Sequence, residues 1–564
     1  MLNPNNRETP QIPSPLDADF EHDLDLYFLG PKSEQRQFLY EALQLVLNDH
    51  VFWRRNYWPK DPPAIGYSKV NGPDARHFRE MFFTELFSLV SDLKLDVPVF
   101  SPRYMAHMIS ETTLPALVAY FATLLYNPNN VSSEASPVTI RYELEVGKQF
   151  ARLFGFDDRT SFGHLTSGGT IANYESLWFH KAGRFLPVAI EMARRSHEGK
   201  RDPTGADALY ELLNVPLQEG EVRLASYLGE GRDPESQWSK LESCLISHLG
   251  DTRFIREVEA QFETRWIEPV VIVPRTAHYC WRRSASLLGI GRDNFLKVAA
   301  YGGYFATIFQ NGEASDPSPL EHDKQIRRAF RALSRVDSVT VDPHKAGYIP
   351  YGAGSIVIKH GYLKDLVAEN APYCLDRDNL TDGDDPRPQL GKFILEGSKP
   401  GAVAASVWFS HRLIPLDNNG YGRQLSTLCR IARRFDAMTS SWDGVVSLFR
   451  PHTNIVCLVA THPSITTYSG LNALNEHLAA RFGVRDVLSI QSYDYLVSRT
   501  TVASDMPVLQ TQPELAALEP DTDALSVMRL VFMNRWVELE EADGNMYLED
   551  FLVKLRAAIE AWAE

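Results

Sequence analysis

Apolar residues recur at helical spacing along several stretches of the chain. Between Ser33 and about Trp53 an apolar residue returns every three or four positions, which predicts an amphipathic helix. Further helices are predicted over residues 113–125, 141–154, 470–481 and 546–562, and one is expected to begin near His278.

Short apolar runs predict strands between these helices. The run Val270 to Val273 is followed by Pro274 and is apolar throughout, as expected of a strand in a parallel sheet that is covered on both faces. Further strands are predicted at 355–358, 455–460 and 527–533. Residues 195–240 are polar and charged and are interpreted as a surface insertion. After about Pro415 strands alternate with helices, which indicates a smaller α/β domain.

Composition narrows the class of protein. A chain of 564 residues that is 44% hydrophobic can bury a large core, and two or three domains are expected. Its net charge of -15 argues against a nucleic-acid partner. The five cysteines are dispersed and form no CxxC motif, which suits a reduced cytoplasmic protein better than a disulfide framework or a metal site. No apolar signal core is seen at the N-terminus, and no apolar run reaches the ~20 residues of a membrane span.

One strand end presents a lysine that is a candidate for covalent chemistry. The β-branched run at 339–341 stops at Asp342-Pro343, so His344 and Lys345 follow directly at the strand terminus. A partly desolvated lysine there can form a Schiff base with a carbonyl group, because its amine can then be neutral. The alternative is an ordinary solvated lysine.

Two further segments are suited to bind a ligand. Thr166 to Thr170 is a run of small residues that leads straight into a helix, which is suited to bind phosphate, although an ordinary Ser/Thr N-cap is the alternative. His278 follows the strand at 270–274, where an imidazole can stack on a flat cofactor or move a proton; a helix-capping histidine is equally compatible. Neither a Walker motif nor a dinucleotide GxGxxG motif is present.

Taken together, these segments resemble a known family over most of the chain. The chain resembles the group II pyridoxal 5′-phosphate (PLP)-dependent amino-acid decarboxylases of the type I, aspartate-aminotransferase fold, and among them the microbial L-tyrosine decarboxylase branch. The residues that carry the resemblance are Trp53 to Tyr57, Arg103-Tyr104 with His107-Met108, Ser136-Pro137, Glu143 to Gly147, Gly168 to Thr170, His278-Tyr279, Ala299 to Gly303, Asp342 to Lys345, and Leu395 to Lys399 with Gly401.

The resemblance implies an architecture and an activity. The fold would be α/β with a mostly parallel central sheet, divided into an N-terminal helical segment (1–110), a large PLP-binding domain (111–415) and a small C-terminal α/β domain (416–564). The activity would be decarboxylation of an L-amino acid, tyrosine-like and aromatic, to the amine and CO2. The family also implies a homodimer, with neither nucleic acid nor membrane as partner.

The resemblance also implies roles for individual residues. Lys345 would form the Schiff base with PLP, and His278 would stack on the cofactor ring. Tyr373 would protonate the substrate from a mobile lid over 376–388, and His107 would line the substrate pocket. The phosphate would be contacted by His344, Gly169, Thr170 and, from the partner subunit, Ser398.

One departure from the family lies just before Ala299. The family has an aspartate there that pairs with the pyridine nitrogen, whereas this chain has Val298. Between Gly291 and Tyr301 the family also has two further βα units, roughly 60 residues. This chain joins the two ends across about eight residues. A skipped exon or faulty gene model and a catalytically impaired homologue are both compatible with this gap. An aldehyde-forming enzyme is a third possibility, ranked lower because Tyr373 is present.

Overall fold

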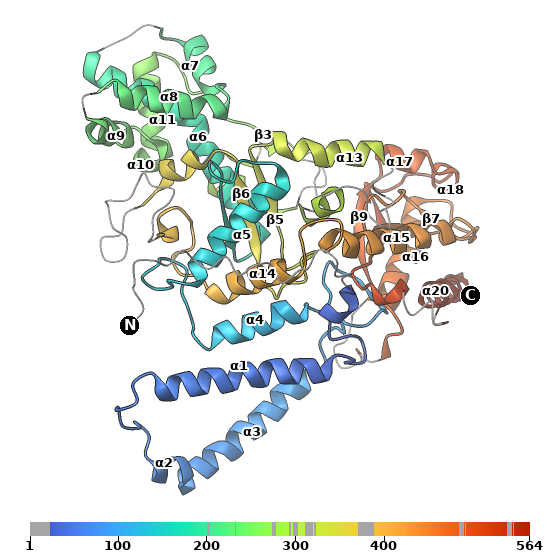
Figure 1. Ribbon diagram of the computed structural model, residues 1–564. Coiled ribbons are helices and arrows are strands. Elements are labelled where there is room, and N and C mark those ends of the chain that lie inside the picture. Colours follow the sequence, from blue (N-terminus) through green and yellow to red (C-terminus); the bar gives the residue numbers. More distant parts are fainter. Residues whose placement is uncertain are drawn as a thin grey trace. The chain divides into compact units, whose positions relative to one another are not determined.

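The computed structural model describes most of the chain: residues 23–199, 203–231, 233–272, 278–292, 295–296, 303–310, 320, 323–369, 388–483, 490, 492–538, 544 and 546–563 (Figure 1). They group into two compact units. The first contains the described residues of 115–310 and 328–416, and the second those of 21–114, 311–327 and 417–564. The division into three functional domains stays a prediction.

The first unit contains the segments singled out for chemistry. Its elements are α4 (Leu114–Leu124), α5 (Thr139–Phe154), β2 (Phe162–Thr166), α6 (Gly169–Glu198), α7 (Ala206–Leu213), α8 (Leu217–Gly229), α9 (Pro234–Glu242), α10 (Ile246–Leu249), α11 (Asp251–Phe262), β3 (Val271–Ile272), α12 (Cys280–Leu287), β4 (Phe295–Leu296), η2 (Gly303–Phe309), η3 (Ala332–Arg335), β5 (Ser338–Val341), β6 (Gly354–Ile358), η4 (Gly361–Val367), η5 (Leu390–Lys392) and α14 (Gly401–Leu413). The helix α13 (Lys324–Arg331) contains the boundary between the units.

Strands β2, β6 and β5 form a sheet in that order, and β6 runs antiparallel to both neighbours. Thr166 at the end of β2 pairs with Gly354, and Val341 at the end of β5 pairs with Ser355. Strands β2 and β5 therefore point the same way and end at the same edge of the sheet. This edge receives both the start of α6 and the turn that carries Lys345.

The expected mostly parallel sheet is wrong for the strands that the structure describes in this unit. The connection from β5 to β6, residues 342–353, contains no crossover helix, and a connection of this kind joins antiparallel neighbours. Among the described strands of this unit, β3 and β4 are the pair that runs parallel.

The expected full coverage of β3 is also wrong. Val270 is 54% exposed and Ile272 is 69% exposed. Among the described strands, β3 pairs only with β4, and β5 pairs only with β6. No described strand joins the pair β3–β4 to the sheet β2-β6-β5, as expected if the segment before Ala299 is missing.

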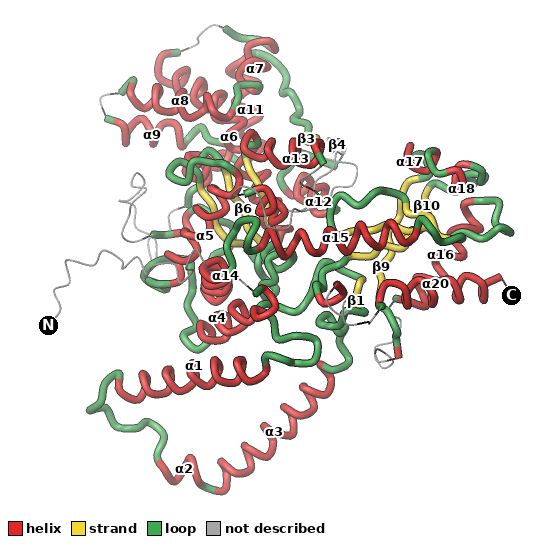
Figure 2. The backbone as a smooth tube through the Cα atoms, turned by 45° about the vertical axis from the view of Figure 1, so that its right-hand side comes forward, coloured by secondary structure: helices red, strands yellow, loops and turns green. Residues whose placement is uncertain are grey.

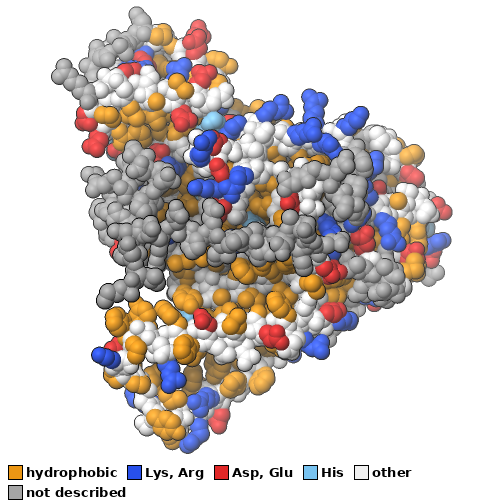
Figure 3. All heavy atoms as spheres, in the orientation of Figure 1, with side chains coloured by type: hydrophobic (Ala, Val, Ile, Leu, Met, Phe, Trp, Pro, Cys, Tyr) orange, Lys and Arg blue, Asp and Glu red, His pale blue; other side chains and the backbone are white. Residues whose placement is uncertain are grey.

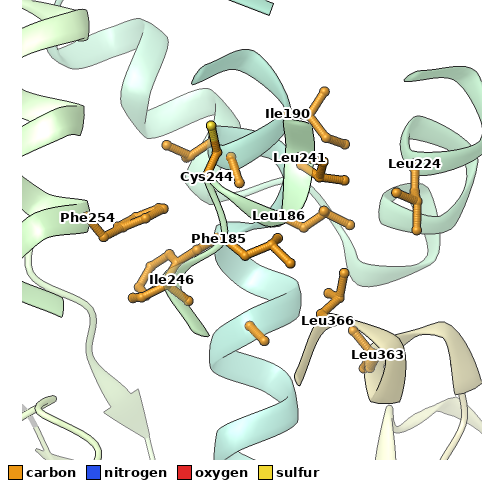
Figure 4. Packing of buried hydrophobic residues seen from close by; sticks show 14 of the residues in the cluster. Phe185, Leu186, Ile190, Leu224, Leu241, Cys244, Ile246, Phe254, Leu363 and Leu366 are labelled. Atoms are coloured by element: carbon orange, nitrogen blue, oxygen red, sulfur yellow. The ribbon is translucent and has the colours of Figure 1, made fainter. Parts of the chain in front are cut away.

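The polar stretch 195–240, interpreted as a surface insertion, forms the end of α6, helices α7 and α8 and most of α9. Together with α10 and α11 these helices pack on α6, and the buried cluster joins Phe185, Leu186 and Ile190 of α6 to Leu241 and Phe254 (Figure 4). Phe254 is fully buried, and its ring centroid lies 5.6 Å from that of Phe185. The insertion therefore stiffens the same helix whose first turn lies at the candidate site.

The second unit contains the predicted smaller α/β domain (Figure 2). Its sheet is mixed, in the order β1-β9-β10-β8-β7, with β1 parallel to β9 and the other pairs antiparallel. The elements of the unit are η1 (Leu24–Tyr27), α1 (Arg36–Asn56), α2 (Tyr67–Asn71), α3 (Pro73–Leu93), β1 (Tyr104–Met105), α15 (Tyr421–Thr439), β7 (Val445–Ser447), β8 (Ile455–Ala460), α16 (Tyr468–Phe482), β9 (Leu496–Ala503), α17 (Pro507–Gln510), α18 (Pro513–Ala516), β10 (Ala524–Val531) and α20 (Tyr547–Ala563).

Helices α1 and α3 form an arm with a largely apolar surface. Phe52 is 69% exposed and Phe87 is 71% exposed, and no residue of α3 is buried. Figure 3 shows hydrophobic side chains gathered along this arm. Neither these helices nor any other described helix combines the length and apolar character that a bilayer span requires.

Candidate active site

Lys345 lies in the turn that follows β5. The turn is closed by the Lys345 N–H, which donates to the carbonyl of Asp342 (3.0 Å), and by the Tyr348 N–H, which donates to the carbonyl of Lys345 (3.1 Å). Tyr348 has a φ of 54°, a conformation that is costly for a bulky residue. The side chain of Lys345 is 32% exposed, and its Nζ lies 2.7 Å from Oδ2 of Asp342. The amine is thus held by a carboxylate and can be reached from solvent.

Asp342 also faces the first turn of α6. Its Oδ1 atom is buried and accepts no hydrogen bond within the described structure. A Cβ atom added to Gly169 would lie 2.5 Å from this oxygen, so the close approach requires glycine. A Cβ atom added to Gly168 would meet nothing within 4 Å. The amides of Gly169 and Thr170 start α6 without an acceptor inside the helix and without a side-chain cap, and such amides are suited to bind an anion.

His344 lies in the same turn with its ring orientation fixed. Its Nδ1 lies 2.6 Å from the carbonyl oxygen of Ala353, and its ring stacks on Tyr351 with centroids 4.6 Å apart. The carbonyl can only accept, so Nδ1 carries a proton and Nε2 is left for a ligand. Burial lowers the pKa of His344, while the charge of Asp342 partly opposes this shift.

His278 is exposed and lies immediately before α12. Its Nδ1 accepts a hydrogen bond from the backbone N–H of Cys280 (3.3 Å), so the neutral ring carries its proton on Nε2. Burial of part of the ring lowers the pKa of His278, and the charge of Lys345 lowers it further. The charge of Asp342 acts on the pKa of His278 in the opposite direction.

A polar chain that the sequence analysis missed links these segments. The hydroxyl of Thr340 in β5 donates to the side-chain oxygen of Asn173 in α6 (2.9 Å), and the amide nitrogen of Asn173 donates to Sγ of Cys280 in α12 (3.3 Å). Only the position of Asn173 one turn into the predicted phosphate-binding helix offered a signal.

Two other predicted site residues, Ser398 and His107, make their contacts elsewhere. Ser398 is exposed, and its Oγ accepts from the amide of Asn129 (3.1 Å). His107 lies in the second unit, where the guanidinium of Arg529 approaches its Nδ1 (3.3 Å). Burial and then Arg529 lower the pKa of His107. Tyr373 lies outside the described residues, as does Val298.

Comparison with known proteins identifies the relatives of the chain. No family model matches it. The L-tyrosine decarboxylase of Levilactobacillus brevis is 30% identical, over 71% of this chain and 72% of the relative. The chain belongs to the L-tyrosine decarboxylase family. The enzyme of that name from Enterococcus faecium is 29% identical, over 86% of this chain and 89% of the relative.

Solved structures support the type I fold of this tyrosine decarboxylase family member. The apo form of mouse CSAD aligns with a TM-score of 0.53 over 93% of this chain and 99% of that one, at 14% sequence identity. The predicted fold class is therefore confirmed, with a mixed sheet where a mostly parallel one was expected.

The alignment to the Enterococcus faecium relative also measures how much this chain lacks. It runs over 577 positions but takes in only 86% of 564 residues, about 485, so about 90 positions fall opposite gaps in this chain. A shortfall of that size accommodates the two βα units expected before Ala299 together with smaller gaps elsewhere.

Proposed function

We propose that this protein is a PLP-dependent L-amino-acid decarboxylase that converts an aromatic substrate such as L-tyrosine into the amine and CO2. The observation that carries the proposal is the Lys345–Asp342 pair, which lies against the first turn of α6 in a chain of the tyrosine decarboxylase family. Bound PLP would supply an electron-poor ring that accepts the electron pair left by departing CO2.

The residues present fit the phosphate and aldehyde ends of PLP. The amides of Gly169 and Thr170 would donate to phosphate oxygens, and Nε2 of His344 is available for the same anion. Lys345 would bond to the aldehyde while Asp342, already 2.7 Å away, balances the positive charge that the nitrogen carries. The predicted stacking of His278 and the predicted roles of Tyr373, His107 and Ser398 belong to this proposal.

The ring-nitrogen end has no partner among the described residues. Asp342 is the carboxylate whose charge acts on His278 and His344, and it is already bound to Lys345. A carboxylate beside a cation typically shifts a pKa by 1–3 units, roughly 1.4–4 kcal/mol, so its loss weakens the electron acceptor. This observation favours a second candidate, a form that binds PLP but decarboxylates poorly.

Borohydride trapping tests the proposal directly. PLP is added to the purified chain, reduced onto its lysine and located by peptide mass mapping. Lys345 is expected to be labelled, whereas Lys345→Ala is expected to abolish the label. Lys364→Ala serves as a control, since Lys364 lies in the same unit and pairs with Asp365. Label at another lysine, or none, contradicts the proposal.

Product analysis separates the candidate reactions. With L-tyrosine, decarboxylation gives tyramine and CO2, while the lower-ranked alternative gives an aldehyde and ammonia. A chain that is labelled at Lys345 but releases neither amine nor aldehyde is the impaired form. Sequencing the transcript between the codons for Gly291 and Tyr301 then decides whether residues were lost from the gene model.

We further propose that two copies associate through the arm formed by α1 and α3. Isolated apolar patches on monomers rarely exceed a few hundred Å². An arm on which Phe52, Phe82 and Phe87 are all more than half exposed is therefore suited to bury its surface against a second copy. Light scattering of the wild type is expected to give the mass of a dimer. Phe82→Asp combined with Phe87→Asp is expected to give a monomer, and a monomeric wild type overturns this proposal.

A cytoplasmic location belongs to the proposal as well. Cys244, Cys280, Cys429 and Cys457 all lie in the described structure as thiols, as expected in a reducing compartment. Cell fractionation with an antibody against the chain tests this.

A further inference from the structure

Four ionisable side chains are almost completely buried behind the phosphate-binding loop, residues 166–169. Glu143, His164 and Glu175 are 0% exposed, and Lys399 is 7% exposed. They come from four separate segments: α5, β2, α6 and the segment 395–399. Burying unpaired charges is costly, so a cluster of this kind persists only where each charge meets a partner.

Lys399 ties the segment 395–399 to the end of β2. Its ammonium donates to the carboxylate of Glu143 and to the backbone carbonyl of Leu165, one residue before the loop. The same carboxylate of Glu143 accepts from the N–H of Leu165 (3.0 Å). The carbonyl and the amide of one residue next to the loop are thus both held by this ion pair.

Glu175 and Glu396 make two further attachments of the same segment. The N–H of Leu395 donates to Oε1 of Glu175 in α6 (2.9 Å). The N–H of Ser167, inside the loop, donates to Oε2 of Glu396 (3.1 Å). The segment 395–399 is therefore attached before the loop, within it and beyond it, and the amides left for a ligand are those that start α6.

His164 lies in the same buried cluster. Its Nδ1 lies 2.7 Å from the carbonyl oxygen of Leu165, and its Nε2 lies 3.0 Å from Oε2 of Glu175. Because a carbonyl oxygen can only accept, Nδ1 donates to it. Burial by itself would raise the pKa of Glu175, but His164, the N–H of Leu395 and Lys399 together outweigh burial and lower it. The ring thus lies between the end of β2 and α6.

We propose that Lys399 is a positioning residue whose buried ammonium, paired with Glu143, locks the segment 395–399 onto the phosphate-binding loop and so fixes the amides that receive the cofactor phosphate. The inference rests on the proposed PLP function and deepens it. Lys399 acts through Leu165 and Glu143 rather than on the cofactor itself. Its effect is to keep Leu165 to Gly169 in the shape that the anion requires before the anion arrives.

Binding of inorganic phosphate and of PLP tests the positioning role. Lys399→Met is expected to weaken both affinities by about tenfold or more. Lys399→Arg is expected to restore them to within about threefold, because the guanidinium keeps the charge and the donors. Glu145→Gln is the matched control: it also lies on α5, but its side chain is 42% exposed and pairs with Arg152. It is expected to bind as the wild type does.

Glu143→Gln keeps the proposal testable if Lys399→Met does not fold. The amide keeps an oxygen for the N–H of Leu165 while removing the charge that pairs with Lys399, and both affinities are expected to fall by about tenfold. Thermal unfolding of each variant separates lost stability from lost affinity. Unchanged phosphate and PLP affinity in folded variants overturns the inference. A wild type that binds phosphate but never forms the lysine bond with PLP overturns the proposed function and leaves this inference standing.

Discussion

Phosphate binding by His344 should consume a proton. With Nδ1 donating to the carbonyl of Ala353 at 2.6 Å, the neutral ring presents a bare lone pair at Nε2, which repels a phosphate oxygen. A contact from Nε2 to the anion therefore needs the imidazolium. Burial lowers the pKa of His344 below its ordinary value of 6.5; Asp342 opposes the shift and Lys345 adds to it. The ring is then neutral in the unliganded site at neutral pH, while its stacking partner Tyr351 stays uncharged.

The size and sign of the effect follow from linkage. The bound anion raises the pKa of His344, so the added affinity is present at low pH and lost as the pH rises through the value in the complex. From about pH 7, above the lowered pKa of the unliganded site, affinity falls by up to tenfold per pH unit, about 1.4 kcal/mol. A phosphate monoester stays dianionic over this range, since its second pKa is about 6.

Calorimetry in buffers of different ionisation enthalpy measures this proton directly. The probe is pyridoxamine 5′-phosphate, which carries the phosphate but lacks the aldehyde that bonds to Lys345. At pH 7.5, His344→Asn is expected to take up about one proton fewer per bound ligand than the wild type. His248→Asn, at an exposed position on α10, is expected to match the wild type. Equal proton uptake by His344→Asn and the wild type refutes the reasoning.

Three further variants test the site and its support. Gly169→Ala is expected to lower PLP affinity by about tenfold or more, because the new Cβ atom would lie 2.5 Å from the carboxylate of Asp342, while Gly168→Ala, with nothing within 4 Å, should change it little; absorbance titration compares the two. Phe254→Ala removes a fully buried ring from α11 and should lower the free energy of unfolding by about 3–5 kcal/mol, as measured with urea. A decrease below about 1 kcal/mol would contradict the packing described for Phe254. Tyr304→Phe removes a buried hydroxyl that lies 2.9 Å from Nε2 of His411. It should lower the free energy of unfolding by about 1–3 kcal/mol, as measured by thermal unfolding.

Local pattern was sufficient to predict several helices and strands because each is specified by its own residues. The helix expected from Ser33 to Trp53 is α1 at Arg36–Asn56, and the helix expected over 546–562 is α20 at Tyr547–Ala563. The strand expected at 455–460 is β8 with the same bounds. The residues of a helix or strand themselves show its apolar period of 3.6 or 2 residues. They do not show which surface covers its apolar face. This is why the pattern predicted α1 but not the surface that covers its apolar side.

Pairing between distant strands could not be predicted in the same way. The residues of β6 are equally apolar whether it runs parallel or antiparallel, and the direction is set by the connection through 342–353. The run at Val270 to Val273 has the composition of a covered strand, yet Ile272 is 69% exposed because coverage depends on neighbours elsewhere in the chain. The polar composition of residues 195–240 likewise gave no sign of the buried cluster to which they contribute, because their apolar residues are spread among many charged ones.

The same distinction, between local motifs and contacts between distant residues, applies to the candidate site. Lys345, His344 and the start of α6 were found because each lies at the end of a strand and is marked by a short motif. The pairing of Asp342 with Lys345 follows from their spacing of three residues in a tight turn. The buried cluster behind the loop had no such marker, because its four members lie up to 256 positions apart. A histidine inside the apolar strand β2 was the one local sign, since a buried polar residue needs a partner.

The loss of one segment before Ala299 would account for several observations that are otherwise unrelated. These are Val298 at the position of an aspartate, the exposed Ile272 on β3, the edge of β5 without a neighbour among the described strands, and the alignment positions opposite gaps. A homologue that had lost its function gradually would be expected to accumulate changes throughout the site. Here Lys345 keeps its carboxylate, Gly169 keeps the close approach that requires it, and Tyr373 is still present in the sequence. The departure singled out in the sequence lies in one stretch, and that favours a skipped exon or a gene-model error over gradual decay. A transcript that carries about 60 further codons before Ala299, including one for aspartate, would supply the absent strands and the absent carboxylate together.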